Sequence, residues 1–248
     1  MAMRTFEEIL KRKRITQYLA NIALGLICKD VDSYIFVATT GRSGSASLAK
    51  LFSHVEGVAS FHEPFPIMNN VYGNAVDKEK ELDEEFRLKK LIIKRAASGH
   101  SHYIETNHQF IKSFSDRAIK EFGKKIKIIH LVREAPLVAK SFYQIGSIPG
   151  KTSKGKSWLL DPTANENIIS LPELSSLDGE YSHDFYKCLW YWYEVEARIN
   201  HLKLKHKDIF MYKIHTEELS SRDKISEMFT ALGIDIDADR LHYYAGYR

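Results

Sequence analysis

Strand-forming runs alternate with helical patterns along most of the chain, and few folds satisfy this order. Five apolar runs have the length and residue types of strands, and the segments between them repeat apolar residues at helical spacing. The expected strands are 34–39, 58–61, 103–106, 126–132 and 209–214, and the expected helices are about 46–54, 83–97, 113–122, 135–145, 184–204 and 221–232. This alternation predicts an α/β fold with a central parallel sheet flanked by helices on both faces.

The length and composition indicate one domain preceded by a short segment. The chain has 248 residues, 44% of them apolar, which suffices for a single core. Residues 1–30 carry a basic cluster at 11–14 before an apolar stretch too short to cross a bilayer. We expect an amphipathic helix there, which packs on the domain or makes weak contact with an anionic membrane surface. The domain is expected over 31–248, with a mobile surface excursion at about 146–180.

The charge balance and the ligand spacing exclude two kinds of partner. Lys and Arg number 36 against 32 Asp and Glu, which gives a formal net charge of +4. This mild excess suits a small polyanion, whereas a nucleic-acid-binding surface needs a strongly basic stripe. The histidines and cysteines lack the spacing of metal ligands. We therefore expect neither nucleic acid nor a bound metal.

The loop after the first expected strand has the composition of an anion-binding turn. Ligands of parallel α/β sheets bind at the carboxyl ends of the strands, where this loop lies. Its glycines allow a tight turn whose backbone N–H groups, with the positive end of the following helix, attract a phosphate or sulfate. Arg42 adds a forked cation, and the serines add hydroxyl donors. The expected binding residues are Thr40, Gly41, Arg42, Ser43, Gly44, Ser45, Ala46 and Ser47.

The fourth expected strand leads into a second anion-binding pattern. Arg133 follows the strand, and Pro136 occupies the first turn of the next helix. Ser141 lies roughly 7–8 Å along that helix from Pro136, at ~1.5 Å rise per residue. We expect the Ser141 hydroxyl and the Arg133 guanidinium to hold one phosphate. Two such anion-binding sites on one sheet predict a ligand with two separated anionic groups.

A literal match to the Walker A pattern occurs elsewhere, at 150–157. That pattern binds nucleotides only between a strand and a helix, whereas here Pro149 precedes it and no strand-like run leads in. We interpret it as a mobile basic loop. The loop at 40–47 is not a Walker A loop either, because no Gly-Lys-Ser/Thr closes it.

The two anion-binding patterns resemble those of sulfotransferases that use 3′-phosphoadenosine-5′-phosphosulfate (PAPS). Gly41-Arg-Ser-Gly-Ser45, followed by Glu63-Pro64, is similar to their 5′-phosphosulfate loop and the glutamate beyond it. The resemblance is greatest to carbohydrate 6-O-sulfotransferases, which carry a tyrosine where this chain has His62. Leu131-Val-Arg133 with Ser141 resembles the 3′-phosphate motif. The last expected strand and the closing helix show a weaker similarity. With them, the resemblance covers about 34–64, 103–143 and 184–234.

The resemblance implies a P-loop-NTPase-like sulfotransferase fold. It implies PAPS as donor, 3′-phosphoadenosine-5′-phosphate (PAP) as product, and transfer of a sulfuryl group without a metal. The acceptor would be a hydroxyl of a small molecule or glycan, and the resemblance favours a carbohydrate or glycoconjugate. Arg42 and the loop N–H groups would stabilise the charge that builds on the departing phosphate. We expect a cytoplasmic enzyme, and the sequence leaves its oligomeric state open.

An acceptor hydroxyl must lose its proton, and two residues are candidates for the base. Glu63 follows the second expected strand and stands where carbohydrate and some bacterial sulfotransferases place a catalytic glutamate. His108 follows the third expected strand and stands where cytosolic sulfotransferases have Lys-Thr-His, with Thr106 in place of the lysine. The better-matched motif favours Glu63. The same loops also fit an ATP-dependent phosphotransferase or a non-catalytic nucleotide-binding module, and both stay open.

Overall fold

The sheet predicted from the sequence is present in the structure. The computed structural model describes residues 31–69, 78–169 and 183–236, so the segment 1–30 and its expected amphipathic helix lie outside the described residues. The strands are β1 (Ser33–Ala38), β2 (Val58–His62), β3 (His102–Thr106), β4 (Ile126–Val132) and β5 (Phe210–His215). They form one sheet in the order β2-β3-β1-β4-β5, and every neighbouring pair is parallel. Each expected strand is confirmed to within one residue at either end.

The helices also follow the predicted order, with short elements that the sequence pattern missed. The α-helices are α3 (Ser45–Ser53), α4 (Lys78–Ala97), α5 (Ser115–Phe122), α6 (Ala135–Gln144), α7 (Ser153–Trp158), α8 (Asp184–Lys205) and α9 (Arg222–Leu232). The short turns are the π-helical η2 (Phe110–Phe114) and the 3-10 helices η3 (Gly123–Lys125) and η6 (Thr216–Ser220). The missed elements η2, η3, α7 and η6 span three to six residues each, too few to display a helical period. Within the described residues, no helix has the length and apolar character needed to span a membrane.

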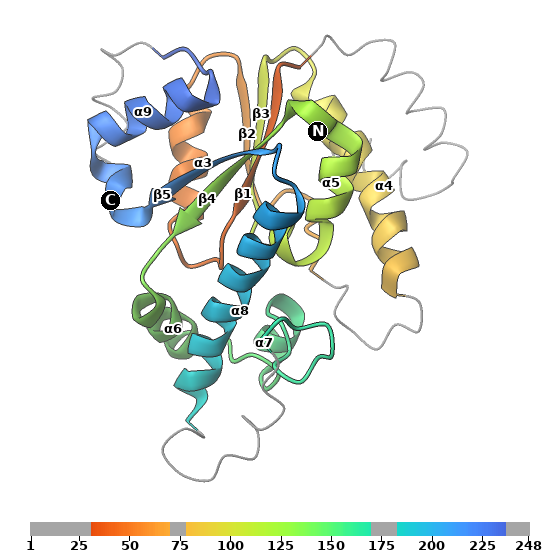
Figure 1. The fold of residues 1–248 in the computed structure, drawn as a ribbon, viewed down its shortest axis with the longest axis vertical. Coiled ribbons are helices and arrows are strands. Elements are labelled where there is room, and N and C mark those ends of the chain that lie inside the picture. The colour runs from red at the N-terminus through yellow and green to blue at the C-terminus, as the bar shows by residue number, and fades with distance from the viewer. Residues whose placement is uncertain (1–30, 70–77, 170–182, 237–248) are drawn as a thin grey trace, which may run out of the picture.

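Alternating side chains of the strands feed two hydrophobic cores, one on each face of the sheet. On β1, Ile35 and Val37 face the core closed by α3 and α9, and Phe36 and Ala38 face the larger core closed by α4, α5 and α8. Figure 1 shows the corresponding layers, with α3 and α9 on one side of the sheet and α4 and α5 on the other. The expectation of helices on both faces is therefore confirmed.

The strand order places a crevice between β1 and β4. The chain leaves β1 toward β2 at one edge of the sheet and leaves β4 toward β5 at the other. Ligands of open parallel sheets bind where two neighbouring connections diverge in this way. Beyond these strand ends lie α6 and α7, together with the amino-terminal part of α8 (Figure 1).

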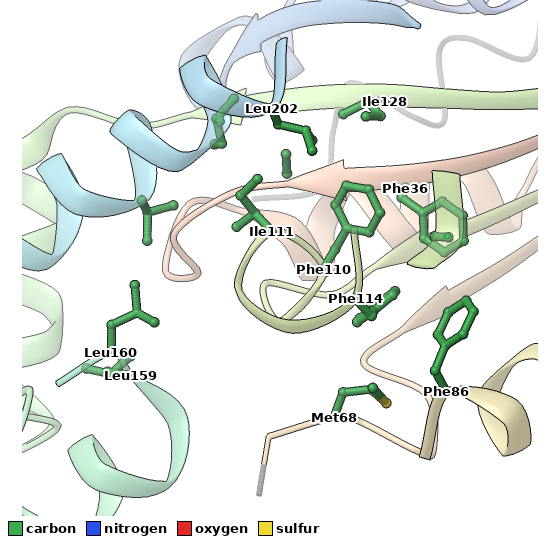
Figure 2. Packing of buried hydrophobic residues seen from close by; sticks show 14 of the residues in the cluster. Phe36, Met68, Phe86, Phe110, Ile111, Phe114, Ile128, Leu159, Leu160 and Leu202 are labelled. Carbon is green, nitrogen blue, oxygen red and sulfur yellow. The ribbon is translucent and has the colours of Figure 1, made fainter. Parts of the chain in front are cut away.

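The described part of the expected excursion, 146–169, is anchored to the domain. Ile148, Leu159 and Leu160 are buried in the larger core, and Figure 2 shows Leu159 and Leu160 facing into it. The helix α7 is capped by Thr152, whose hydroxyl accepts a hydrogen bond from the Gly155 N–H at 3.0 Å. The Walker-like segment is thus a capped helix packed on the domain, not the loop expected from its composition. The element preceding it in the described chain is the helix α6, not a strand.

Candidate active site

A cavity of about 480 Å³ opens at the carboxyl ends of the strands, over the β1–β4 crevice. Its walls come from the loops after β1, β2, β3 and β4 and from the segment that carries α7. Eight of the residues predicted from the sequence line it, namely Gly41, Arg42, Gly44, Ser45, Ala46, Glu63, His108 and Arg133. The lining also includes His62, Phe142, Ile145, Ser147, Lys154 and Trp158. Residues 70 positions apart and more thus meet in one site.

The loop after β1 is held in a fixed shape by hydrogen bonds to its carbonyl oxygens. Gly41 and Gly44 have φ of +80° and +82°, which glycine adopts without a steric penalty. Four successive carbonyls accept side-chain hydrogen bonds at 2.7–2.9 Å. The donors, in order for residues 40 to 43, are the Tyr191 hydroxyl, the Thr40 hydroxyl, the Arg133 guanidinium and the Thr216 hydroxyl. Because the N–H of a trans peptide points away from its carbonyl, this pinning leaves the N–H side of the turn to a ligand.

The start of α3 supports the same conclusion. Gly44 is the N-cap residue and offers the helix no side-chain cap. The N–H groups in the first turn of an α-helix have no partner within the helix, so those of Ser45, Ala46 and Ser47 can receive an anion. The partial positive charge of the helix terminus favours a phosphate or sulfate at this position. The residues present therefore fit a phosphate-bearing donor.

The hydroxyl groups of the loop contribute less than its sequence suggests. Ser43 is fully buried, and its hydroxyl is hydrogen-bonded to that of Thr39. Thr40 is buried too, and its hydroxyl bonds to the Gly41 carbonyl at 2.8 Å. Ser47 is exposed on α3. Of the three predicted serine hydroxyls, that of Ser45 belongs to a residue lining the cavity.

The two predicted anion-binding sites meet at Arg42. Its Nε donates to the Ser141 hydroxyl at 2.9 Å, and its carbonyl accepts from Arg133 Nη1 at 2.9 Å. The structure thus brings the predicted trio together, although Arg133 and Ser141 are joined through Arg42 and not directly to each other. Arg42 is exposed and adopts a left-handed φ of +56°, which turns its side chain from the loop toward α6. Two guanidinium groups therefore lie at adjoining strand ends.

Glu63 lies just beyond β2 and faces the third strand's loop. Its carboxylate Oε1 is 3.4 Å from Nε2 of His108. The residue has a left-handed φ of +46°, a conformation that costs of order 1–3 kcal/mol and is tolerated where the surroundings fix it. Burial raises the pKa of the Glu63 carboxyl, while the nearby His62 and Lys112 act in the opposite direction. A raised pKa brings a carboxylate closer in strength to a general base at neutral pH.

His108 lies deeper than Glu63, beneath the anion-binding loop. A Cβ atom on Gly41 would approach the imidazole Cγ to 3.2 Å, so glycine allows this close packing. The ring stacks on Trp158, with centroids 5.8 Å apart and planes 12° apart. Burial, followed by the charge of Lys112, lowers the pKa of His108 well below its usual value. The imidazole is therefore neutral at physiological pH.

A buried ion pair supports the segment that carries Glu63. Lys89 on α4 lies 2.7 Å from the Glu105 carboxylate on β3, and their side chains are 1% and 0% exposed. Glu105 also accepts hydrogen bonds from Tyr103 and Asn107, both at 2.9 Å. The Lys89 ammonium donates in addition to the Pro66 carbonyl at 2.7 Å. The pair thus ties the residues after Glu63 to β3.

The sequence pattern misses four residues that contact the site or its supporting segments, namely Lys112, Tyr191, Thr216 and Lys89. Lys112 lies four residues after His108, the one local signal among them. The others reach the site from α8, η6 and α4, and no spacing in the sequence connects them to it. In the part of the chain that the structure describes, no three His, Cys, Asp or Glu side chains gather as a metal site would require.

Comparison with known proteins finds likeness at the level of the fold. No family model matches the sequence, and no curated protein matches it. The sulfotransferase domain from the curacin biosynthetic pathway superposes with a TM-score of 0.53 at 15% identity, over 89% of this chain and 80% of that domain. The sulfotransferase domain of the Synechococcus PCC 7002 olefin synthase gives a TM-score of 0.53 at 15% identity, over 89% and 79%. The parallel five-stranded sheet and its flanking helices thus have the P-loop-like sulfotransferase fold, as the sequence predicts.

Proposed function

We propose that this protein is a sulfotransferase that moves the sulfuryl group of PAPS to a hydroxyl of a carbohydrate or glycoconjugate. One observation carries the proposal: the pinned anion-binding loop with Arg42 and Arg133 opens into the same cavity as Glu63 and His108. An anion grip and a candidate base in one cavity are what group transfer from an anionic donor requires. The likeness to sulfotransferase domains supports this choice over other P-loop-like chemistries.

The chain offers two charged groups and a helix terminus to the donor nucleotide. PAPS, when bound, supplies the sulfuryl group. The N–H groups of the loop and of the first turn of α3 would hold its 5′ end, with Arg42 beside the bridging oxygen. Arg133, at the neighbouring strand end, would hold the second phosphate. Fixed donors of this kind stabilise developing charge because they need no reorganisation during the reaction.

Glu63 is the residue we assign as general base. Both residues line the cavity, and the Glu63 side chain is 26% exposed against 7% for His108, so an acceptor hydroxyl reaches the carboxylate first. The raised pKa of Glu63 suits proton removal near neutral pH. Trp158, Phe142 and Ile145 line the same cavity, and an aromatic face is a suitable support for the apolar face of a sugar ring.

The function is tested by donor binding followed by transfer. Calorimetry with PAP measures whether the nucleotide binds, and an acceptor screen with ³⁵S-labelled PAPS measures transfer to glycans and small hydroxyl compounds. Parallel reactions with ATP and Mg²⁺ test the phosphotransferase alternative. Turnover with ATP and none with PAPS would refute the proposal. PAP binding without transfer to any acceptor would favour a nucleotide-binding module.

Removing either arginine should weaken donor binding. Arg42→Ala is expected to lower kcat by on the order of 10²–10³-fold, the usual cost of removing one donor at a developing charge, and to weaken PAP binding. Arg133→Ala should chiefly weaken PAP binding, because its proposed contact is to the phosphate remote from the reaction. Calorimetry and steady-state kinetics measure both effects. Lys140→Ala, which removes an exposed cation of α6, is the control, and equal losses in this variant would contradict the assignment.

The pH profile should report the raised pKa of Glu63. A base must be deprotonated to act, so kcat/KM should fall as the pH decreases through this pKa. Because burial raises the pKa, the fall should occur at a higher pH than for an ordinary glutamate. Rates with labelled PAPS across the acidic range measure it. A rate that stays constant down to the usual carboxyl range would contradict the role of Glu63.

A further inference from the structure

Lys112 is a buried lysine that belongs to no pattern recognised in the sequence. It lies in the π-helical turn η2, between Phe110 and Phe114, whose rings pack on Phe36 at centroid distances of 5.0 and 6.0 Å. Figure 2 shows these three rings together in the core. π-Helical turns in proteins occur frequently at functional sites. Both anchors of the turn are thus fixed, and Lys112 is held against His108, which lines the cavity.

The ammonium of Lys112 has three hydrogen-bond partners. Its Nζ lies 2.7 Å from the Trp158 carbonyl oxygen, 3.1 Å from the Tyr191 hydroxyl and 2.8 Å from Nδ1 of His108. Two of these partners, the Trp158 carbonyl and the Tyr191 hydroxyl, can only accept a hydrogen bond from the ammonium. A carbonyl oxygen has no proton, and the single hydroxyl hydrogen of Tyr191 is donated to the Thr40 carbonyl at 2.9 Å. The third N–H of the ammonium is therefore directed at His108.

This arrangement decides which nitrogen of His108 carries the proton. An imidazole nitrogen that accepts a hydrogen bond is unprotonated, and a neutral imidazole then carries its hydrogen on the other nitrogen. That nitrogen, Nε2, is the one 3.4 Å from the Glu63 carboxylate. Burial lowers the pKa of Lys112 well below its usual value, and the Glu63 carboxylate opposes that change. The tautomer follows from the ammonium form, because a neutral amine keeps two N–H groups and a lone pair that would accept from Nδ1–H.

We propose that Lys112 is a positioning residue that holds His108 in its Nε2–H tautomer. His108 then directs its Nε2–H toward the Glu63 carboxylate, 3.4 Å away, and has no free lone pair for an acceptor proton, so Glu63 is left as the base. Through Tyr191, the same ammonium is connected to the Thr40 carbonyl of the anion-binding loop. Lys112 thus fixes the position of the anion-binding loop, through Tyr191, and of the His108 ring beside Glu63. The catalytic part of this inference rests on the proposed function, and the tautomer does not.

Nitrogen-15 NMR of the histidine rings tests the tautomer without any turnover. His108→Gln identifies the His108 signals by their disappearance. In the unaltered protein we expect Nδ1 in the range of an unprotonated imidazole nitrogen and Nε2 in the range of a protonated one. Lys112→Met, which keeps the length of the side chain and removes its donors, should abolish this preference. A His108 that carries its proton on Nδ1 in the unaltered protein overturns the proposal, even if Lys112→Met does not fold.

Kinetics then tests the positioning role. Lys112→Met should lower kcat by on the order of 10–100-fold, as misplaced reacting groups do, while the KM for PAPS changes less than threefold. Lys120→Met, at an exposed site of α5, should leave kcat unchanged. An unaltered tautomer or an unaltered kcat in Lys112→Met overturns the inference. If no acceptor is sulfated by any form of the protein, the proposed function fails, and the NMR result still decides the tautomer.

Discussion

Glu63→Gln should lower kcat by on the order of 10²–10⁴-fold, the usual contribution of a positioned base, and leave the affinity for PAP unchanged. The amide keeps the size of the side chain and loses its capacity to accept a proton. The anion-binding loop, whose carbonyls are fixed by Tyr191, Arg133 and Thr216, does not depend on Glu63. Calorimetry with PAP and steady-state rates with labelled PAPS separate the two quantities.

A matched substitution shows whether the effect belongs to the site. Glu56→Gln removes the same charge from an exposed position after α3 and should leave kcat within twofold of the unaltered protein. Unchanged turnover in Glu63→Gln, combined with loss of activity in His108→Ala, would reverse the assignment of the base. It would also oppose the Nε2–H tautomer, because His108 could then accept a proton from the cavity.

The fold could be predicted from the sequence because its signals are local. Strand 126–132 was predicted to the residue, since an apolar run bounded by polar residues needs only its neighbours to be recognised. The anion-binding loop could also be predicted from the sequence. Gly41 and Gly44 lie between a strand and a helix, and both have the left-handed φ that their residue type suggested.

The contacts that shape the site could not be predicted in the same way. Tyr191 and Thr216 bond to the loop carbonyls of Thr40 and Ser43 across 151 and 173 residues of sequence. Such contacts follow from tertiary packing, which residue spacing does not encode. The hydroxyl of Ser43 was expected to face a ligand, because serine in a glycine-rich turn is a common anion donor. The structure directs it to Thr39 instead, since the strand end leaves a buried hydroxyl there that needs a partner.

The buried ion pair of Lys89 and Glu105 is a further feature of the site that the sequence does not indicate. Lys89 and Glu105 fall in segments that read as an amphipathic helix and an apolar strand, where a charged residue is usually exposed. Here both are buried and paired. A buried ion pair adds little net stability over apolar residues of the same shape, but it imposes a specific geometry. In this site that geometry fixes the Pro66 carbonyl, three residues after Glu63.

Lys89→Met should therefore lower the free energy of unfolding by about 3–5 kcal/mol, the cost of leaving one charge of a buried pair uncompensated. Glu105 would keep its hydrogen bonds from Tyr103 and Asn107 but lose its counter-charge. Denaturant-induced unfolding measures the change. Adding Glu105→Gln to Lys89→Met should recover part of the loss, because a neutral amide removes the unpaired charge. Lys120→Met, at an exposed position of α5, should change stability by less than about 0.5 kcal/mol.

The double substitution also separates stability from function. It restores charge neutrality but not the bond to the Pro66 carbonyl, so the segment after Glu63 stays unanchored. We expect stability to rise from Lys89→Met to the double variant while kcat stays low, because a base displaced by about 1 Å loses on the order of 10²-fold in rate. Recovery of both quantities together would show that the pair acts through charge alone. Loss of less than 1 kcal/mol in Lys89→Met would contradict the burial of the pair itself.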